Sequence, residues 1–255
     1  MLLDENSSRE EVLKCIESNP FYFLDKFSDK PWAQPYIDEA AKRAASKSSF
    51  YFLFYFSEKP WAQPYIDEAA KISIEKEDSF DFLYHFSSKP WAQPYIDEAA
   101  KRAAKKDPYH FLHYFSDKPW AQPHIDEAAK GVAKKSPFYF LHNFSDKPWS
   151  QPYIDEATKE AAKEKPYVFL DKFSDEPWAK PYLGGAAKKA VKNNPCYFLC
   201  DFLDKPWAQP YIEAAVKEAV KINPEFFLGE LADKFPQYIN TALFALGDEN
   251  VSKLK

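Results

Sequence analysis

Four of the five histidines in this chain lie in successive, similar sequence segments, and histidine is the side chain best suited to bind metal or move protons near neutral pH. They are His85, His110, His113 and His142. Three of them, with Asp81 as a fourth ligand, could hold zinc or nickel. Their spacing matches no known metal-binding motif, and histidine is also a common polar contact residue. We therefore predict no metal site.

Residues arranged for catalysis are scarce in the rest of the sequence. No nucleophile elbow, Walker loop or HExxH motif occurs, and only 5 glycines are present to form phosphate-binding loops. The three cysteines, Cys15, Cys196 and Cys200, are odd in number and form no CxxC pair, so neither a disulfide framework nor a structural zinc site is expected. We predict that the protein is not an enzyme and needs no cofactor.

The composition narrows the class of partner. The 255 residues include 34 Lys and Arg against 39 Asp and Glu, a net charge of −5, whereas proteins that bind nucleic-acid phosphates normally carry a basic excess. The N-terminal residues lack the pattern of a signal peptide, and no stretch approaches the ~18 apolar residues of a membrane span. We expect a cytoplasmic protein that contacts no membrane.

A repeated segment organises the chain. The seven tryptophans lie 29 or 30 residues apart, each within a version of Pro-Phe-Tyr-Phe-Leu-x-x-Phe-Ser-Asp-Lys-Pro-Trp-Ala-Gln-Pro-Tyr-Ile-Asp-Glu-Ala-Ala-Lys. We predict an N-terminal capping helix in 1–19, with a capping box at Ser8 and Glu11, and a degenerate C-terminal capping repeat in 224–255. The seven repeats between them are 20–48, 49–78, 79–107, 108–136, 137–165, 166–194 and 195–223.

Each repeat is predicted to form two helices joined by a tight turn. In the second half, Ile37, Ala40 and Ala44 recur at helical spacing. In the first half, with the first residue counted as position 0, positions 3, 4 and 7 are always Phe, Leu and Phe, whereas positions 2, 5 and 6 vary. These two sets occupy opposite faces of a helix but would not separate on a strand. The sequence thus predicts an all-α solenoid of seven ~29-residue helix-turn-helix repeats with capping helices.

The repeats resemble the helical hairpins of HEAT-like and leucine-rich-variant repeats. The residues that carry the resemblance are the Asn-Pro that opens a repeat, as at Asn19 and Pro20, the Phe-Leu-x-x-Phe helix, the Asp turn and the Ala-Ala-x-x-Ala helix. The resemblance covers roughly residues 19–245 and implies stacked helical hairpins. The period and the Trp-Ala-Gln-Pro-Tyr segment match no family whose function could be transferred.

The recurring aromatic residues are predicted to be structural. Trp32 and its six equivalents should fill the seam between repeats rather than stack on a ligand, because a buried tryptophan supplies a large contact area. Phe23, Phe27 and Tyr36 are expected to have the same core role. His124 stands where other repeats have this tyrosine and is interpreted as a tolerated substitution.

Positions 2, 5 and 6 of the first helices, named here the variable face, are where the repeats differ most. They are rich in Tyr, His, Asp, Asn and Phe, the residues typical of adaptable binding surfaces, and the aromatic and histidine content is densest in the second to fifth repeats. The predicted partner-binding residues are Tyr51, Phe54, Tyr55, Asp81, Tyr84, His85, His110, His113, Tyr114, Tyr139, His142 and Asn143.

The favoured function is a non-enzymatic scaffold that binds a protein or peptide along the variable face. One alternative is a modular reader of single-stranded nucleic acid, which would need a basic track, whereas this face has Lys26 and Lys172 but also Asp25 and Asp81. A second alternative is a structural spacer that binds no ligand. A third alternative is that the variable side chains have no binding role and simply pack between neighbouring first helices.

Overall fold

The computed structural model describes residues 3–246, which are helical apart from short turns and contain no strand. The chain divides into two compact units, Met1–Ala128 and Ala129–Lys255, and the boundary falls within helix α9 (Gln122–Lys135). Each unit is built from helical hairpins in which a first helix of eight residues precedes a longer second helix.

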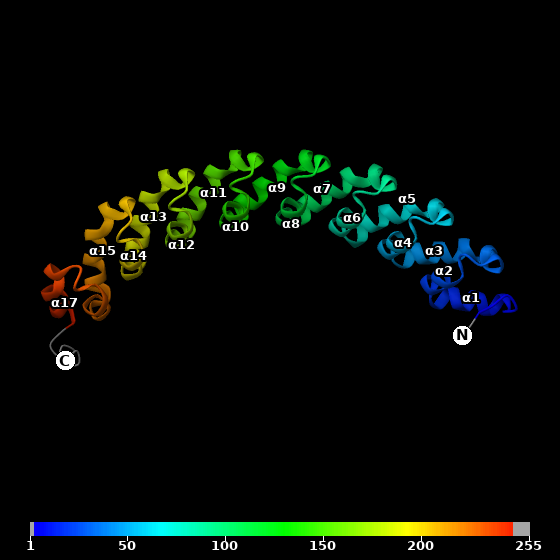
Figure 1. The fold of residues 1–255 in the computed structure, drawn as a ribbon, viewed down its shortest axis with the longest axis horizontal. Coiled ribbons are helices and arrows are strands. Elements are labelled where there is room, and N and C mark those ends of the chain that lie inside the picture. The colour runs from blue at the N-terminus through cyan, green and yellow to red at the C-terminus, as the bar shows by residue number, and fades with distance from the viewer. Residues whose placement is uncertain (1–2, 247–255) are drawn as a thin grey trace. The chain divides into compact units, whose positions relative to one another are not determined.

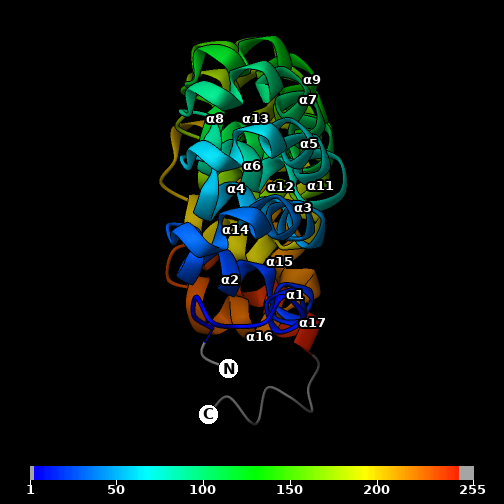
Figure 2. The same ribbon diagram turned by 90° about the vertical axis from the view of Figure 1, so that its right-hand side faces the viewer.

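Unit 1 begins with the capping helix α1 (Arg9–Ser18). Figures 1 and 2 show the first and second helices of its repeats in two rows. The first helices are α2 (Pro20–Phe27), α4 (Ser49–Phe56), α6 (Ser79–Phe86) and α8 (Pro108–Phe115). The second helices that precede α9 are α3 (Ile37–Lys47), α5 (Gln63–Ile72) and α7 (Ile96–Lys106). Short 3-10 segments join them, namely η1 (Pro31–Tyr36), η2 (Pro60–Ala62), η4 (Pro90–Tyr95) and η5 (Pro119–Ala121).

Unit 2 repeats the same hairpin. Its first helices are α10 (Pro137–Phe144), α12 (Pro166–Phe173) and α14 (Pro195–Phe202). Its second helices are α11 (Gln151–Glu164), α13 (Lys180–Asn193) and α15 (Gln209–Ile222), preceded by η6 (Pro148–Ser150), η7 (Pro177–Ala179) and η8 (Pro206–Ala208). The degenerate last repeat forms α16 (Pro224–Phe226), a π-helical turn η9 (Phe227–Leu231), η10 (Pro236–Tyr238) and α17 (Ile239–Leu246). The predicted C-terminal cap, 224–255, extends beyond the described residues.

The helix ends follow from local side-chain chemistry. At α1 the predicted capping box is confirmed, because Ser8 Oγ accepts from Glu11 N–H at 3.3 Å and the Glu11 carboxylate accepts from Ser8 N–H at 2.8 Å. At the end of α2, Gln34 Nε2 donates to the carbonyl oxygen of Ser28 at 2.8 Å. Equivalent glutamines close most of the other first helices, so this recurring residue has a structural role.

The predicted core face is confirmed. The phenylalanine at position 3 is fully buried in each repeat and in the degenerate last one. Most alanines of the second helices are also buried, and their small side chains let neighbouring helices approach closely. Neighbouring second helices pack against each other, as α3 and α5 do in unit 1 and α11 and α13 in unit 2. The all-α solenoid predicted from the sequence is the architecture observed.

The tryptophans are less buried than the sequence predicted. They are half-buried rather than enclosed in the core, and each ring lies against phenylalanines of its own repeat, as Trp61 does with Phe56 at 5.4 Å between ring centroids. The 3-10 segment that carries the tryptophan does approach the preceding repeat, since η4 packs against α5. The tryptophan therefore braces its own hairpin at the edge of the seam.

The second repeat contains one more residue than the others, since Trp61 and Trp91 are 30 residues apart. The extra residue is absorbed by a π-helical turn, η3 (Ser73–Glu77), because π-helical bonding accommodates one additional residue within a helix. This turn places the Glu77 carboxylate against the start of α4, where it accepts from the backbone N–H groups of Ser49 at 2.9 Å and Phe50 at 2.7 Å. Glu77, near the C-terminal end of the second repeat, thereby caps the first helix of the same repeat.

Candidate partner-binding face

The variable face of unit 1 is exposed to solvent. The large apolar and aromatic side chains that are more than a third exposed in the described part of unit 1 all occupy its positions 2, 5 and 6. They are Tyr22, Tyr51, Phe54, Tyr55, Tyr84 and Tyr114. Asp81, His85, His110 and His113 are exposed as well. These side chains are therefore not packed away between neighbouring first helices.

Within unit 1 the rings of the variable face touch one another from repeat to repeat. Tyr51 stacks on Tyr55 along α4, with ring centroids 6.2 Å apart. Phe54 reaches His85 on α6 at 5.5 Å. Tyr84 on α6 in turn meets Tyr114 on α8 edge to face at 5.9 Å. The result is a nearly continuous aromatic surface across three first helices.

Position 1 supplies a layer beneath this surface that our sequence analysis did not single out. Phe50 lies against His85 and Phe86 of the next repeat, at 5.3 and 5.5 Å between centroids. Phe80 lies in the same way against Tyr114 and Phe115, at 5.5 and 5.1 Å. The sequence did contain a signal for this layer, because position 1 is aromatic in each of the first six repeats. These half-buried rings hold neighbouring first helices together and support the exposed ones.

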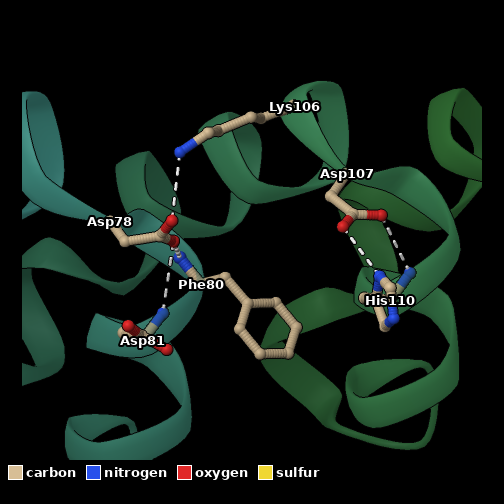
Figure 3. Close-up of polar contacts among 6 residues, drawn as sticks. All are labelled: Asp78, Phe80, Asp81, Lys106, Asp107 and His110. Carbon is tan, nitrogen blue, oxygen red and sulfur yellow. Dashed lines mark hydrogen bonds and ion pairs between the residues drawn. The ribbon is translucent and has the colours of Figure 1, made fainter.

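The histidines do not converge on a common point. His85 sits among Phe50, Phe54 and Tyr84. His110 Nδ1 lies 2.7 Å from a carboxylate oxygen of Asp107, which also accepts from the His110 backbone N–H at 3.2 Å (Figure 3). Within residues 3–246, no three His, Cys, Asp or Glu side chains gather as a metal ion would require.

A polar cluster lies where α6 and α8 begin (Figure 3). Asp78 caps α6 by accepting from the Phe80 N–H at 2.7 Å, and it also pairs with Lys106 at 3.0 Å. Burial raises the pKa of Asp78, but the hydrogen bonds and charge of Lys106 and the Phe80 N–H outweigh it, so the pKa lies below its ordinary value. Asp78, Phe80, Asp81, Lys106, Asp107 and His110 line a hollow of about 240 Å³ together with Ser79 and Ala103.

The variable face of unit 2 is less aromatic. Tyr139 and His142 are exposed, whereas Asn143 is half-buried and donates from its amide to the carbonyl oxygen of Tyr139 at 2.8 Å. Farther along, the Tyr167 hydroxyl donates to Asp201 of the next repeat. Burial, followed by this hydrogen bond, raises the pKa of Tyr167. Of the predicted residues in unit 2, Asn143 is thus engaged within its own helix.

Hydrogen bonds also link the second halves of neighbouring repeats in unit 1. The hydroxyls of Tyr65 and Tyr95 donate to Asp38 and Asp67 of the preceding repeats. Burial, then the hydrogen bond, raises the pKa of each tyrosine to about 12. His124 keeps this link, with its Nε2 3.0 Å from Asp97. The tyrosines expected in the core therefore also connect repeats, and the substitution by His124 preserves the connection.

Comparison with protein-family models, curated proteins and solved structures finds no match for this chain. No helix in the described range 3–246 has both the length and the apolar character needed to cross a membrane. The arrangement of residues in the site is therefore the basis for a functional proposal.

Proposed function

We propose that the protein is a non-enzymatic repeat scaffold that binds a protein or peptide through the variable face, centred on α4, α6 and α8. The observation that carries the proposal is the exposure of six large aromatic side chains at these variable positions in unit 1. Exposed aromatic surface of this extent is costly in water and is typical of a surface that a partner covers. Tyrosine also has a hydroxyl that can hydrogen-bond, and its side chain loses little conformational entropy on binding.

The alternative functions have less support. α4, α6 and α8 contain no lysine or arginine, so they offer no basic track for a nucleic-acid backbone. A structural spacer would not need aromatic side chains concentrated on one face. A cytoplasmic location belongs to the same proposal, and it is supported by three cysteines that form no disulfide among the described residues.

Peptide selection tests the proposal directly. Displayed random peptides are selected on the wild-type protein and measured against a variant with alanine at Tyr51, Tyr55, Tyr84, His113 and Tyr114. Because each aromatic anchor at a hot spot contributes about 2 kcal/mol, we expect affinity for the selected peptides to fall by more than about 30-fold while the helical content remains.

The matched control places alanine at Glu68 and Lys101, which are exposed on second helices of the same unit. This variant should bind the selected peptides as the wild type does. Equal binding by all three proteins would contradict the proposal, and so would unfolding of the variable-face variant, since its side chains would then be packing residues.

A further inference from the structure

On α4, α6 and α8 the variable face contains one full charge. Across α4, α6 and α8 the only formally charged side chain is Asp81, in the middle helix. Asp81 is exposed, and its carboxylate oxygens make no hydrogen bond or ion pair with any described residue. Its backbone N–H donates to the Asp78 carboxylate at 3.4 Å (Figure 3). The face thus presents a single uncompensated negative charge.

Aromatic residues occupy the positions next to Asp81 on the variable face. Asp81 occupies position 2 of its repeat, where the neighbouring repeats have Tyr51 and His110. One turn farther along α6, on the same side of the helix, Tyr84 is 58% exposed and contacts Tyr114. A cation bound at Asp81 would therefore also lie beside the faces of electron-rich rings.

The charges next to Asp81 do not neutralise it. Asp78, Asp81 and Asp107 all line the hollow between α6 and α8, whereas Lys106 is the one lysine that lines it. Lys106 is held by Asp78 at 3.0 Å. The Phe80 ring lies between Asp81 and His110 in Figure 3 and gives the hollow an apolar side. The surroundings therefore favour a cationic group that also has an apolar or planar surface.

We infer that this face binds a peptide segment whose anchoring side chain is an arginine, with its guanidinium paired to Asp81 and stacked beside Tyr84. This inference rests on the proposed peptide-binding function. Arginine fits better than lysine, because its planar guanidinium pairs with a carboxylate through two hydrogen bonds, stacks on aromatic rings and is more weakly hydrated. The uncharged remainder of the face would contact apolar or aromatic side chains on either side of the arginine.

A second copy of this chain is a poorer source of the arginine. The chain has three arginines, and two of them, Arg43 and Arg102, are each held at 2.6 Å by a glutamate of their own helix. A separate partner is therefore the occupant that the charges favour.

The test compares peptides selected from a random display library on four proteins. These are the wild type, Asp81→Asn, Asp81→Lys and the control Glu68→Gln, which removes an exposed carboxylate from the second helix α5 of the same unit. We expect the wild type and Glu68→Gln to enrich peptides with one arginine flanked by apolar residues. Asp81→Asn should lose this preference, and Asp81→Lys should instead enrich peptides that have Asp or Glu in place of the arginine. Circular dichroism establishes that all four proteins are equally folded.

One synthetic peptide from the wild-type selection then measures the pairing itself. Replacing its arginine with citrulline, which has nearly the same shape but no charge, should weaken binding to the wild type about 10-fold and leave binding to Asp81→Asn unchanged. If no peptide is enriched on the wild type, the proposed function fails. If peptides are enriched without arginine, or if Asp81→Asn selects the same arginine, the function stands and this inference is wrong. Salt-sensitive binding of single-stranded RNA in place of peptides would overturn both.

Discussion

At the scale of single residues, Asp78 has two structural roles. It caps α6 through the Phe80 N–H, and it binds Lys106 at the end of the second helix of the next repeat. Asp107 caps α8 in the same way, whereas Glu77 serves α4 and Asn19 serves α2. Neutral asparagine is also a good helix cap, so the charge of Asp78 can be separated from its capping role by substitution.

The pKa of Asp78 leads to a prediction about acid stability. Because this pKa is lowered in the folded state, its contribution is present above the ordinary value of 3.8 and is lost as the pH falls through the folded-state value. Asp78→Asn should reduce the free energy of unfolding by less than about 1 kcal/mol at neutral pH, because the ion pair is partly exposed. Urea unfolding at neutral pH and below pH 3.8 measures this difference, which should shrink in acid.

The control for this prediction is Glu68→Gln, which removes an exposed carboxylate elsewhere in unit 1. It should leave the pH dependence of unfolding as in the wild type. A difference between Asp78→Asn and the wild type that stayed constant, or grew, as the pH fell would show that the charge of Asp78 does not stabilise the fold.

At the scale of elements, the sequence predicted both helices of each repeat and the side that each first helix buries. It succeeded because seven copies separate constant from variable positions, and Phe52 and Leu53 are buried while Tyr51 is exposed, as that separation requires. Phe80 and its equivalents were overlooked, because position 1 lies between the two faces and its role depends on the next repeat. The enclosed tryptophan was predicted wrongly, because recurrence indicates a structural role without indicating how deeply the side chain is buried.

Phe80 and Tyr84 lie one turn apart on α6 and should behave in opposite ways. Phe80→Ala removes a ring that contacts Tyr114 and Phe115 of the next repeat, so we expect a loss of about 2 kcal/mol in the free energy of unfolding. Tyr84→Ala removes an exposed ring and should cost no more than about 0.5 kcal/mol. Chemical denaturation of both variants measures the two effects, and equal losses would contradict the assignment of a supporting layer and an exposed layer.

At the scale of the whole molecule, repetition predicted the order of the hairpins but not how they divide into two units. Adjacent repeats share nearly the same residues at their contacts, and no change in composition marks the boundary within α9. The π-helical turn η3 was also missed, although the spacing of 30 residues between Trp61 and Trp91 indicated an insertion. A spacing alone does not distinguish a longer loop from a widened helical turn.

Because each hairpin packs mainly on its neighbours, the effect of a core substitution should depend on its place in the array. Phe23 and Phe82 occupy the same position of the first and third repeats, and both are fully buried. Phe82→Ala leaves a cavity between the second and fourth repeats, away from the N-terminal end of the array, and it should lower the free energy of unfolding by about 3–5 kcal/mol. Phe23→Ala should instead allow the first repeat and α1 to open locally, which costs the remaining repeats little. Hydrogen exchange distinguishes the two outcomes, since Phe23→Ala should remove protection within 9–47 and preserve it in α5 to α7, whereas Phe82→Ala should weaken protection on both sides of α6. Loss of protection along all of unit 1 in both variants would mean that this unit unfolds as a single cooperative block, and the nearest-neighbour description would then be wrong.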